Sequence, residues 1–277
     1  MAASLNIIGA GHVGRALGRL FAQRGRFEVQ DVLTRSQASA HDAVAFIGAG
    51  RPVHELARLR PAAVWMLAVG DDQIGGLCAS LAQTGLLANS VVFHCSGARS
   101  SSELHAARQA GASAASVHPV RSFADPAGVA AAFEGTFCGI EGDHAALALL
   151  GPAFEAIGAR LVPIDAAAKT VYHAASVFAS NYLVTVLDAA LRAYQAAGIA
   201  PEVASELARP LATETLANVF RLGPEAALSG PIARGDMATV DRQQRAVTGW
   251  DAPAGELYAA LAEATVDLAR RKRGGHA

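Results

Sequence analysis

Short apolar runs alternate with amphipathic helical patterns over the first half of the chain. The apolar runs predict strands at 5–8, 27–33, 63–69, 90–94, 113–117 and 136–141. Between them, helical spacing predicts helices at 13–24, 37–48, 72–83, 101–109 and 143–157. This alternation is typical of βαβ units, in which helices connect neighbouring parallel strands. The first half therefore predicts an α/β domain built on a doubly wound parallel sheet.

The pattern changes near residue 165. From there to the end, almost every segment has helical spacing, and the run from 165 to 198 is long enough to be the spine of an all-α domain. Asp165 can cap the start of this helix, and Gly198 can end it. We therefore expect two domains, 1–164 and 165–277, with the boundary set by the change of period alone.

Composition narrows the class of protein. Of the 277 residues, 52% are hydrophobic and 17% charged, which is too apolar for disorder. The net charge of −1 gives the chain no excess of positive charge with which to bind nucleic acid. No uninterrupted apolar run reaches the ~18–20 residues of a membrane span, and the three cysteines lack metal-site spacing. We expect a cytoplasmic protein that binds a small molecule and neither metal, membrane nor nucleic acid.

A glycine-rich turn follows the first predicted strand and opens the first helix. It has the G-x-G-x-x-G pattern, in the order Gly9, Ala10, Gly11, His12, Val13, Gly14. In this context the glycines permit a tight turn, close approach of a pyrophosphate, and packing of the helix on the strand. The free N–H groups of the helix start then face the phosphates. The pattern predicts a dinucleotide site.

The end of the second strand indicates which dinucleotide binds. NAD-binding proteins place an acidic residue there, about 20 residues past the glycines. Here the positions are Thr34, Arg35 and Ser36, whose guanidinium and hydroxyl groups can bind a 2′-phosphate, while Asp31 lies too early. The sequence favours NADP. Val69, at the end of another strand, should line the same sheet edge.

Two further segments follow predicted strands and carry polar side chains. In the first, residues 94–97, Ser96 and neighbouring N–H groups can hold a carboxylate or a carbonyl oxygen. In the second, residues 118–123, His118 can act as an acid or base, and Arg121 can clamp a substrate carboxylate. The alternative for His118 is a histidine packed under the sheet edge.

The long helix carries a polar stripe at positions i, i+3, i+4, i+7 and i+11, made of Lys169, Tyr172, His173, Ser176 and Ser180. A solvated face would usually carry Glu, Arg and Gln, so the stripe favours a helix that lines a wet cleft; a polar seam in a dimer interface is the alternative. Lysine occurs elsewhere only at Lys272, which suggests that Lys169 is present because it can give up a proton. Arg234, in a dense loop, either reaches the cleft or binds Asp236 locally.

Five motifs in this order resemble a bacterial family with a Rossmann-like N-terminal domain and an α-helical C-terminal domain of unknown function: GAGHVG, HCSGA, HPVRSF, KTVYHAASVFASNY and LSGPIARGD. This family is related to deazaflavin-dependent NADP oxidoreductase, pyrroline-5-carboxylate reductase, ketopantoate reductase and hydroxyacid dehydrogenases. The resemblance implies an NADP-linked oxidoreductase with a helical domain of the 6-phosphogluconate-dehydrogenase C-terminal-like type. It leaves the substrate open.

The resemblance also suggests roles for individual residues. The ketopantoate and hydroxyacid enzymes have a catalytic Lys that Lys169 matches, but where they have an Asn about one turn later, this chain has His173. The proton donor therefore stays open between Lys169 and His173. His118 is similar to the histidine in the His-Pro pair of prephenate dehydrogenases. In this reading Ser96, His118 and Arg234 orient the substrate.

The sequence thus favours an NADPH-dependent reductase of a small 2-oxo acid, such as ketopantoate, or of an imine. The alternatives are deazaflavin–NADP hydride exchange and a non-catalytic NADP-binding sensor or assembly protein. We also expect a homodimer through the helical domain, because its alanine-rich helices carry more apolar surface than about 110 residues can bury.

Overall fold

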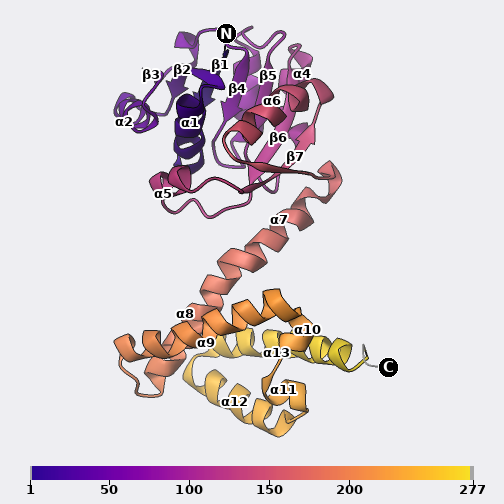
Figure 1. Ribbon diagram of the computed structural model, residues 1–277. Helices are drawn as coiled ribbons and strands as arrows, with labels where there is room; N and C mark the ends of the chain where they lie inside the picture. Colours follow the sequence, from indigo (N-terminus) through magenta and orange to yellow (C-terminus); the bar gives the residue numbers. More distant parts are fainter. Residues whose placement is uncertain (1, 275–277) are drawn as a thin grey trace. The chain divides into compact units, whose positions relative to one another are not determined.

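The computed structural model describes residues 2–274 and contains one eight-stranded sheet (Figure 1). The strand order is β3-β2-β1-β4-β5-β6-β7-β8. The strands are β1 (Ala3–Ile8), β2 (Phe27–Leu33), β3 (Arg51–Val53), β4 (Val64–Leu67), β5 (Val91–His94), β6 (Ser113–Pro119), β7 (Phe137–Gly142) and β8 (Arg160–Pro163). All neighbouring pairs are parallel except β6 and β7. The predicted fold class, a Rossmann-like domain followed by helices, is confirmed.

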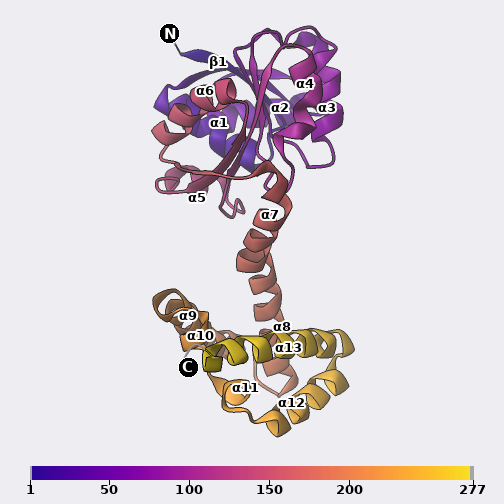
Figure 2. The same ribbon diagram turned by 90° about the vertical axis from the view of Figure 1, so that its right-hand side faces the viewer.

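Helices cover both faces of this sheet (Figure 2). Along β4, Val64 and Met66 pack with α1 (His12–Arg24), α2 (Gln37–Ile47) and α6 (His144–Ala156), while Trp65 and Leu67 pack with α3 (Ile74–Ala82) and α4 (His105–Gln109). Side chains alternate between the faces of a strand, so a strand covered on both sides must be apolar at every position. This explains the uninterrupted apolar run in β4.

The structure adds elements that the apolar pattern did not indicate. These are the edge strands β3 and β8 and the short helix α5 (Pro126–Ala131). Both strands are short and carry arginine and proline, so they lack an apolar run. The antiparallel pairing of β6 and β7 also departs from the predicted parallel sheet. Its reason is that α5 packs against α1 and does not cross back over the sheet, as a parallel connection requires.

The predicted long helix is continuous from Ala166 to Ala196. It begins with a 3₁₀ turn and consists of α7 (Lys169–Val177), a π-helical segment (Phe178–Tyr182) and α8 (Leu183–Ala196). The Asp165 side chain caps the start by accepting a hydrogen bond from the Ala167 N–H at 2.9 Å. Gly198, with φ of +88°, follows the end in the left-handed conformation that favours glycine.

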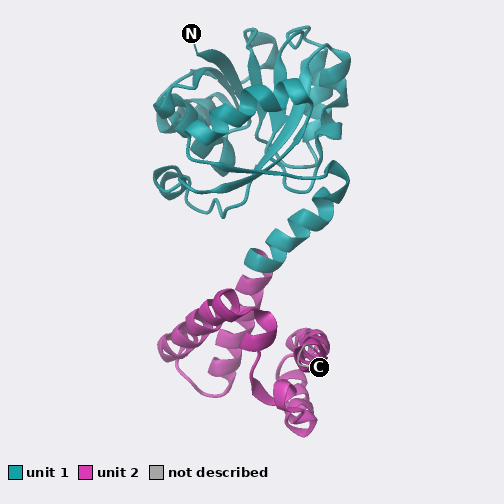
Figure 3. Ribbon diagram, turned by 45° about the vertical axis from the view of Figure 1, so that its right-hand side comes forward, with its two compact units in different colours: residues 1–180 teal, residues 181–277 magenta. Residues whose placement is uncertain are grey.

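The chain divides into two compact units, residues 1–180 and 181–277 (Figure 3). The predicted boundary of 164/165 marks the point where strands give way to helices. The compact division falls later, inside the π-helical segment, because Lys169 and neighbouring side chains at the start of the long helix bind the sheet domain.

The second unit consists of helices alone. After α8 come α9 (Pro201–Leu222), α10 (Pro224–Ala227), α11 (Gly230–Arg234), α12 (Met237–Trp250) and α13 (Ala252–Gly274). Within this unit α8 packs on α9, and α13 packs on α10, α11 and α12. The apolar residues buried here are small except for Val240, whereas α8 and α9 expose several large ones. A single copy of the chain therefore leaves much apolar helix surface uncovered.

The long helix Ala166–Ala196 also has the length and apolar composition of a membrane-crossing helix. The mean hydropathy of its most apolar 18-residue window is 1.4, and none of that window is buried. Polar residues at helical spacing interrupt this stretch, so it contains no uninterrupted apolar run of the length that a membrane span needs.

Candidate functional site

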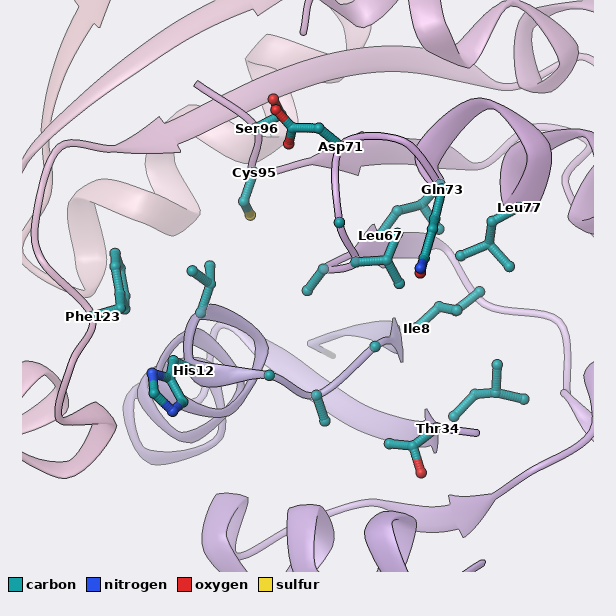
Figure 4. A pocket seen from close by; sticks show the side chains of 18 of the residues that line it. Ile8, His12, Thr34, Leu67, Asp71, Gln73, Leu77, Cys95, Ser96 and Phe123 are labelled. Atoms are coloured by element: carbon teal, nitrogen blue, oxygen red, sulfur yellow. The ribbon is translucent and has the colours of Figure 1, made fainter. Parts of the chain in front are cut away.

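A cavity of about 980 Å³ lies at the carboxyl ends of the central strands (Figure 4). Its lining comes from the segments that follow β1, β2, β3, β4, β5 and β6 and from the helices α2, α3 and α7. Because β2 lies on one side of the β1–β4 pair and β5 and β6 lie on the other, the cavity has two ends, marked by Thr34 and Ser96. Open α/β sheets bind ligands at this kind of crossover point.

Two glycines of the first turn are required by packing. Gly9 has φ of +86°, and a Cβ on it would lie 2.6 Å from Val69 Cγ1. A Cβ on Gly14 would lie 2.5 Å from the Gly9 carbonyl oxygen. Both contacts are too short for any side chain, so these glycines let α1 pack against β1 and the end of β4.

Gly11 has no such packing reason, because a Cβ there would have nothing within 4 Å. It is the N-cap residue of α1, and no side chain caps this helix start. The first N–H groups of a helix lack partners within the helix and attract anions. Gly9, Ala10, Gly11, His12 and Val13 all line the cavity, whereas Gly14 packs behind it. The start of α1 is thus uncapped, and the space beside Gly11 is open. These two features together fit a bound pyrophosphate group.

At the β2 end of the cavity, Thr34 and Arg35 are part of the lining. Ser36 is not: its Oγ caps α2 by accepting a hydrogen bond from the Ser39 N–H at 3.2 Å. Asp31 is fully buried and bound to Arg51 and Arg60, so its carboxylate cannot bind a ribose, as its early position in the strand indicated.

Two residues at this end were missed by sequence reasoning, Ser39 and His54. His54 reaches the cavity because it follows β3, the edge strand that the sequence pattern did not reveal. The pairing of β3 with β2 was the information needed to find it.

At the other end, His94 holds the loop after β5 together. The ring is buried, and its Nδ1 accepts a hydrogen bond from the Ser96 N–H at 3.2 Å. Its Nε2 lies 3.0 Å from the Ser100 carbonyl oxygen, so Nε2 must be the donor in that hydrogen bond. The ring is therefore neutral, and burial lowers the pKa of His94 to about 4. Ser96 Oγ in turn accepts the N–H groups of Ala98 and Arg99 at 3.2 and 2.9 Å.

Two imidazoles meet at this loop, and both line the cavity. The rings of His118 and His173 are 5.6 Å apart between centroids and nearly perpendicular. His118 Nδ1 lies 2.9 Å from the Tyr172 hydroxyl oxygen. Burial, and then the nearby His173 and Lys169, lower the pKa of His118 to about 4, so it is neutral at pH 7. The buried Nδ1 of His173 has no hydrogen-bond partner among the described residues.

Gly97 makes room for both rings. A Cβ on Gly97 would lie 2.8 Å from Cε1 and Nε2 of His118 and would overlap Nδ1 of His173. The sequence drew attention to residues 94–97 but not to this glycine, because the contact joins three segments that are far apart in the chain.

Lys169 lies behind the loop and is not part of the described cavity lining. Its side chain is 3% exposed, and Nζ donates hydrogen bonds to the Ser96 carbonyl oxygen at 2.9 Å and to Ser116 Oγ. Nζ also lies 3.8 Å from Glu141 Oε1. Burial lowers the pKa of Lys169, while the Glu141 carboxylate opposes this change. The lysine joins the long helix to the loop after β5.

The remaining candidates have local partners. Arg121 lines the cavity, and its Nη1 donates to the Ala132 carbonyl oxygen and to Thr136 Oγ1. Arg234 is the last residue of α11 in the second unit. The pKa of the exposed Asp236 is lowered mainly by its hydrogen bonds with Thr239, and the charge of Arg234 adds a smaller contribution. This position agrees with the alternative in which Arg234 interacts locally with Asp236.

Burial raises the pKa of the Cys95 thiol, which makes it a poor nucleophile.

Two family models match the chain. A Rossmann-like domain matches residues 2–119, and a domain of unknown function, DUF2520, matches residues 136–265. The chain therefore joins a Rossmann-like domain to a DUF2520 domain, and the resemblance that the motifs indicated is confirmed. No curated protein has significant sequence similarity to the chain.

Solved structures share this fold over nearly the full chain. A Bacteroides fragilis protein described as a candidate NADP oxidoreductase is 19% identical, with a TM-score of 0.78 and coverage of 96% of this chain and 98% of its own. A Thermotoga maritima protein is 25% identical, with a TM-score of 0.71 and coverage of 97% and 99%. An imine reductase from Myxococcus stipitatus in complex with NADP⁺ is 16% identical, with a TM-score of 0.65 and coverage of 99% and 95%. The fold is one that NADP-linked oxidoreductases adopt.

Proposed function

We propose that this protein is an NADPH-dependent reductase of a small C=O or C=N compound, either a 2-oxo acid of the ketopantoate type or an imine. The observation that carries the proposal is that one cavity joins the uncapped helix start at Gly11 to the His118–His173 pair. A dinucleotide site and a pair of acid–base side chains are the two parts that such a reaction needs.

Cofactor binding would fall to residues of the cavity lining. Residues 9–13 would hold the pyrophosphate, and Thr34 and Arg35 would bind the 2′-phosphate that distinguishes NADP from NAD. When bound, NADPH supplies a hydride, and the protein has to orient the substrate and manage the proton.

We assign proton exchange with the substrate to His173. His173 lines the cavity, and its ring lies 5.6 Å from the ring of His118 between centroids, so its imidazole can meet a substrate bound there. Neutral His118, fixed by Tyr172, would orient the reacting group through a hydrogen bond. General acid–base help of this kind typically contributes about 10²–10⁴ in rate.

Lys169 is better suited to positioning than to proton donation. Its ammonium group donates to Ser96 and Ser116 on the far side of the loop and contributes no surface to the described cavity. It lies one helical turn before His173, so the bonds that fix Lys169 also fix where His173 meets the loop.

The test is NADPH oxidation by the purified protein across a panel of small 2-oxo acids and cyclic imines, with a deazaflavin as a separate arm. We expect turnover of at least one panel compound, and a fall of about 10²–10⁴ in kcat for His173→Asn. Turnover of the deazaflavin alone would favour hydride exchange between cofactors. Tight NADPH binding without turnover of any compound would favour a non-catalytic sensor.

A further inference from the structure

Charge is unevenly distributed between the two ends of the cavity. Among the described residues that line it, Asp71 is the one carboxylate, and it follows β4 on the loop that faces β5. Figure 4 shows Asp71 and Ser96 together at one end and Thr34 at the other. Burial lowers the pKa values of His94, His118 and Lys169, and the negative charge of Asp71 opposes this change in part, so that charge acts on the side of the cavity where the imidazoles lie.

The positive side chains near this end already have hydrogen-bond partners in the protein. Lys169 is buried behind the loop with its donors used by Ser96 and Ser116. Arg121 donates to the Ala132 carbonyl oxygen and Thr136. Arg35 belongs to the opposite end of the cavity, next to Thr34.

The groups left to meet a substrate are thus the Asp71 carboxylate and the imidazoles of His118 and His173, of which His118 is neutral at pH 7. A carboxylate accepts hydrogen bonds, and each neutral imidazole has one nitrogen that accepts. A substrate that carries a carboxylate would be repelled by Asp71 and would have to compete with the Ala132 carbonyl oxygen and Thr136 for Arg121. A substrate with a positively charged N–H group would find an opposite charge and acceptors.

We infer that the Ser96 end of the cavity binds the protonated C=N group of an imine, and the ammonium group of the corresponding amine, with Asp71 as counter-ion. The inference rests on the proposed function and selects the imine over the 2-oxo acid as its substrate class. In this step His173 supplies the proton that converts the neutral imine into its protonated form, and addition of the hydride from NADPH to the carbon then gives a neutral amine and NADP⁺. The imidazoles then accept a hydrogen bond from the N–H group.

The experiment compares three ligands that share one ring and differ in charge: cyclohexylammonium, cyclohexanol and cyclohexanecarboxylate. Each is titrated calorimetrically into the protein with and without saturating NADP⁺. We expect the ammonium to bind at least about tenfold more tightly than the carboxylate. Asp71→Asn should remove most of this preference while NADP⁺ affinity stays within about twofold of the parent value.

Asp72→Asn is the matched control, because Asp72 is adjacent in sequence and is not part of the described cavity lining. It should keep the parent preference. Tighter binding of the carboxylate, no binding of the ammonium, or an unchanged preference in Asp71→Asn would overturn the inference. A loss of NADP⁺ affinity in Asp71→Asn with the ammonium preference intact would also overturn it, because Asp71 would then belong to the cofactor site.

Failure of the proposed function gives a different result. The titrations measure binding without turnover, so a protein that reduces nothing still shows whether Asp71 selects a cation. A protein that binds the ammonium through Asp71 but does not bind NADP⁺ would contradict the reductase proposal alone.

Discussion

Gly97 lies against the imidazole of His173 with no space between them for a side chain, and a Cβ on Gly97 would also come within 2.8 Å of His118 Nε2. The loop after β5, the end of β6 and the start of the long helix therefore meet at one glycine. If the imidazole pair performs the chemistry, the smallest possible side chain at this position should disturb it.

We predict that Gly97→Ala lowers kcat by about 10²-fold, because displacing a catalytic group by about 1 Å has an effect of this size. The dissociation constant for NADPH should stay within about twofold, since the Gly11 turn is untouched. Gly76→Ala in α3 is the control: a Cβ there meets nothing within 4 Å, so activity should be unchanged. Parent-like kcat in Gly97→Ala would place the chemistry elsewhere in the cavity.

The buried lysine gives the second prediction. Lys169→Met should destabilise the fold by about 2–4 kcal/mol, because Glu141 keeps its hydrogen bonds from Ser101 but loses its buried positive partner. The double variant Lys169→Met/Glu141→Gln should recover part of this loss, since neither charge is then buried alone. Chemical denaturation of the four proteins, including Glu141→Gln, measures the coupling.

The same variants distinguish positioning from proton donation. With a positioning role, kcat of Lys169→Met falls but the shape of its pH profile matches the parent. Loss of the basic limb of the profile in Lys169→Met, together with its retention in His173→Asn, would identify Lys169 as the proton donor.

The third prediction concerns pH and His94. Its pKa falls from 6.5 to about 4 in the fold because of burial, so between these values only the unfolded chain gains a proton. Stability from this group is intact above pH 6.5 and is lost as pH falls toward 4. The loss should reach about 2 kcal/mol near pH 5, measured by denaturation at several pH values. His94→Gln should show a shallower pH dependence than the parent, whereas His105→Gln, at an exposed position of α4, should not. Equal slopes in all three proteins would contradict the assignment.

The fourth prediction is the association state. In α9, Val203, Leu207 and Leu211 form a stripe at four-residue spacing and are 47%, 46% and 60% exposed. Such a stripe is costly in water, and we propose that a second copy of the chain covers it. Sedimentation at micromolar concentration should show a dimer that Leu207→Glu/Leu211→Glu dissociates, while Ser205→Glu, on another face of α9, has no effect. A monomeric parent protein would contradict the proposal.

The sequence predicted the elements that carry strong local signals. Spacing and residue type were enough to predict the glycine turn, the apolar central strands and the position of the β2 end. They also predicted the long helix, with Asp165 and Gly198 at its ends. Edge strands β3 and β8 have too few apolar residues to produce such a signal, so His54, which follows β3, was missed.

The candidate site was harder to predict than the fold because its contacts join distant segments. The polar stripe drew attention to Lys169 and His173, but helical spacing alone cannot show that Lys169 is buried in the protein interior while His173 lines the cavity. Gly97 and Asp71 gain their meaning only once β4, β5, β6 and the long helix are brought together. Arg234 has a local environment in the second unit, which sequence reasoning had left as one of two alternatives.

The claim that this cavity is built for NADPH is tested most directly by measuring the dissociation constants of NADPH and NADH for the parent protein and for Arg35→Ala. Charge-assisted hydrogen bonds to the 2′-phosphate should make NADPH bind more tightly by about 1.5–3 kcal/mol, which is about 10- to 150-fold. Arg35→Ala should remove most of this difference by weakening NADPH binding and leaving NADH binding unchanged. Equal dissociation constants for the two cofactors in the parent protein would contradict the claim.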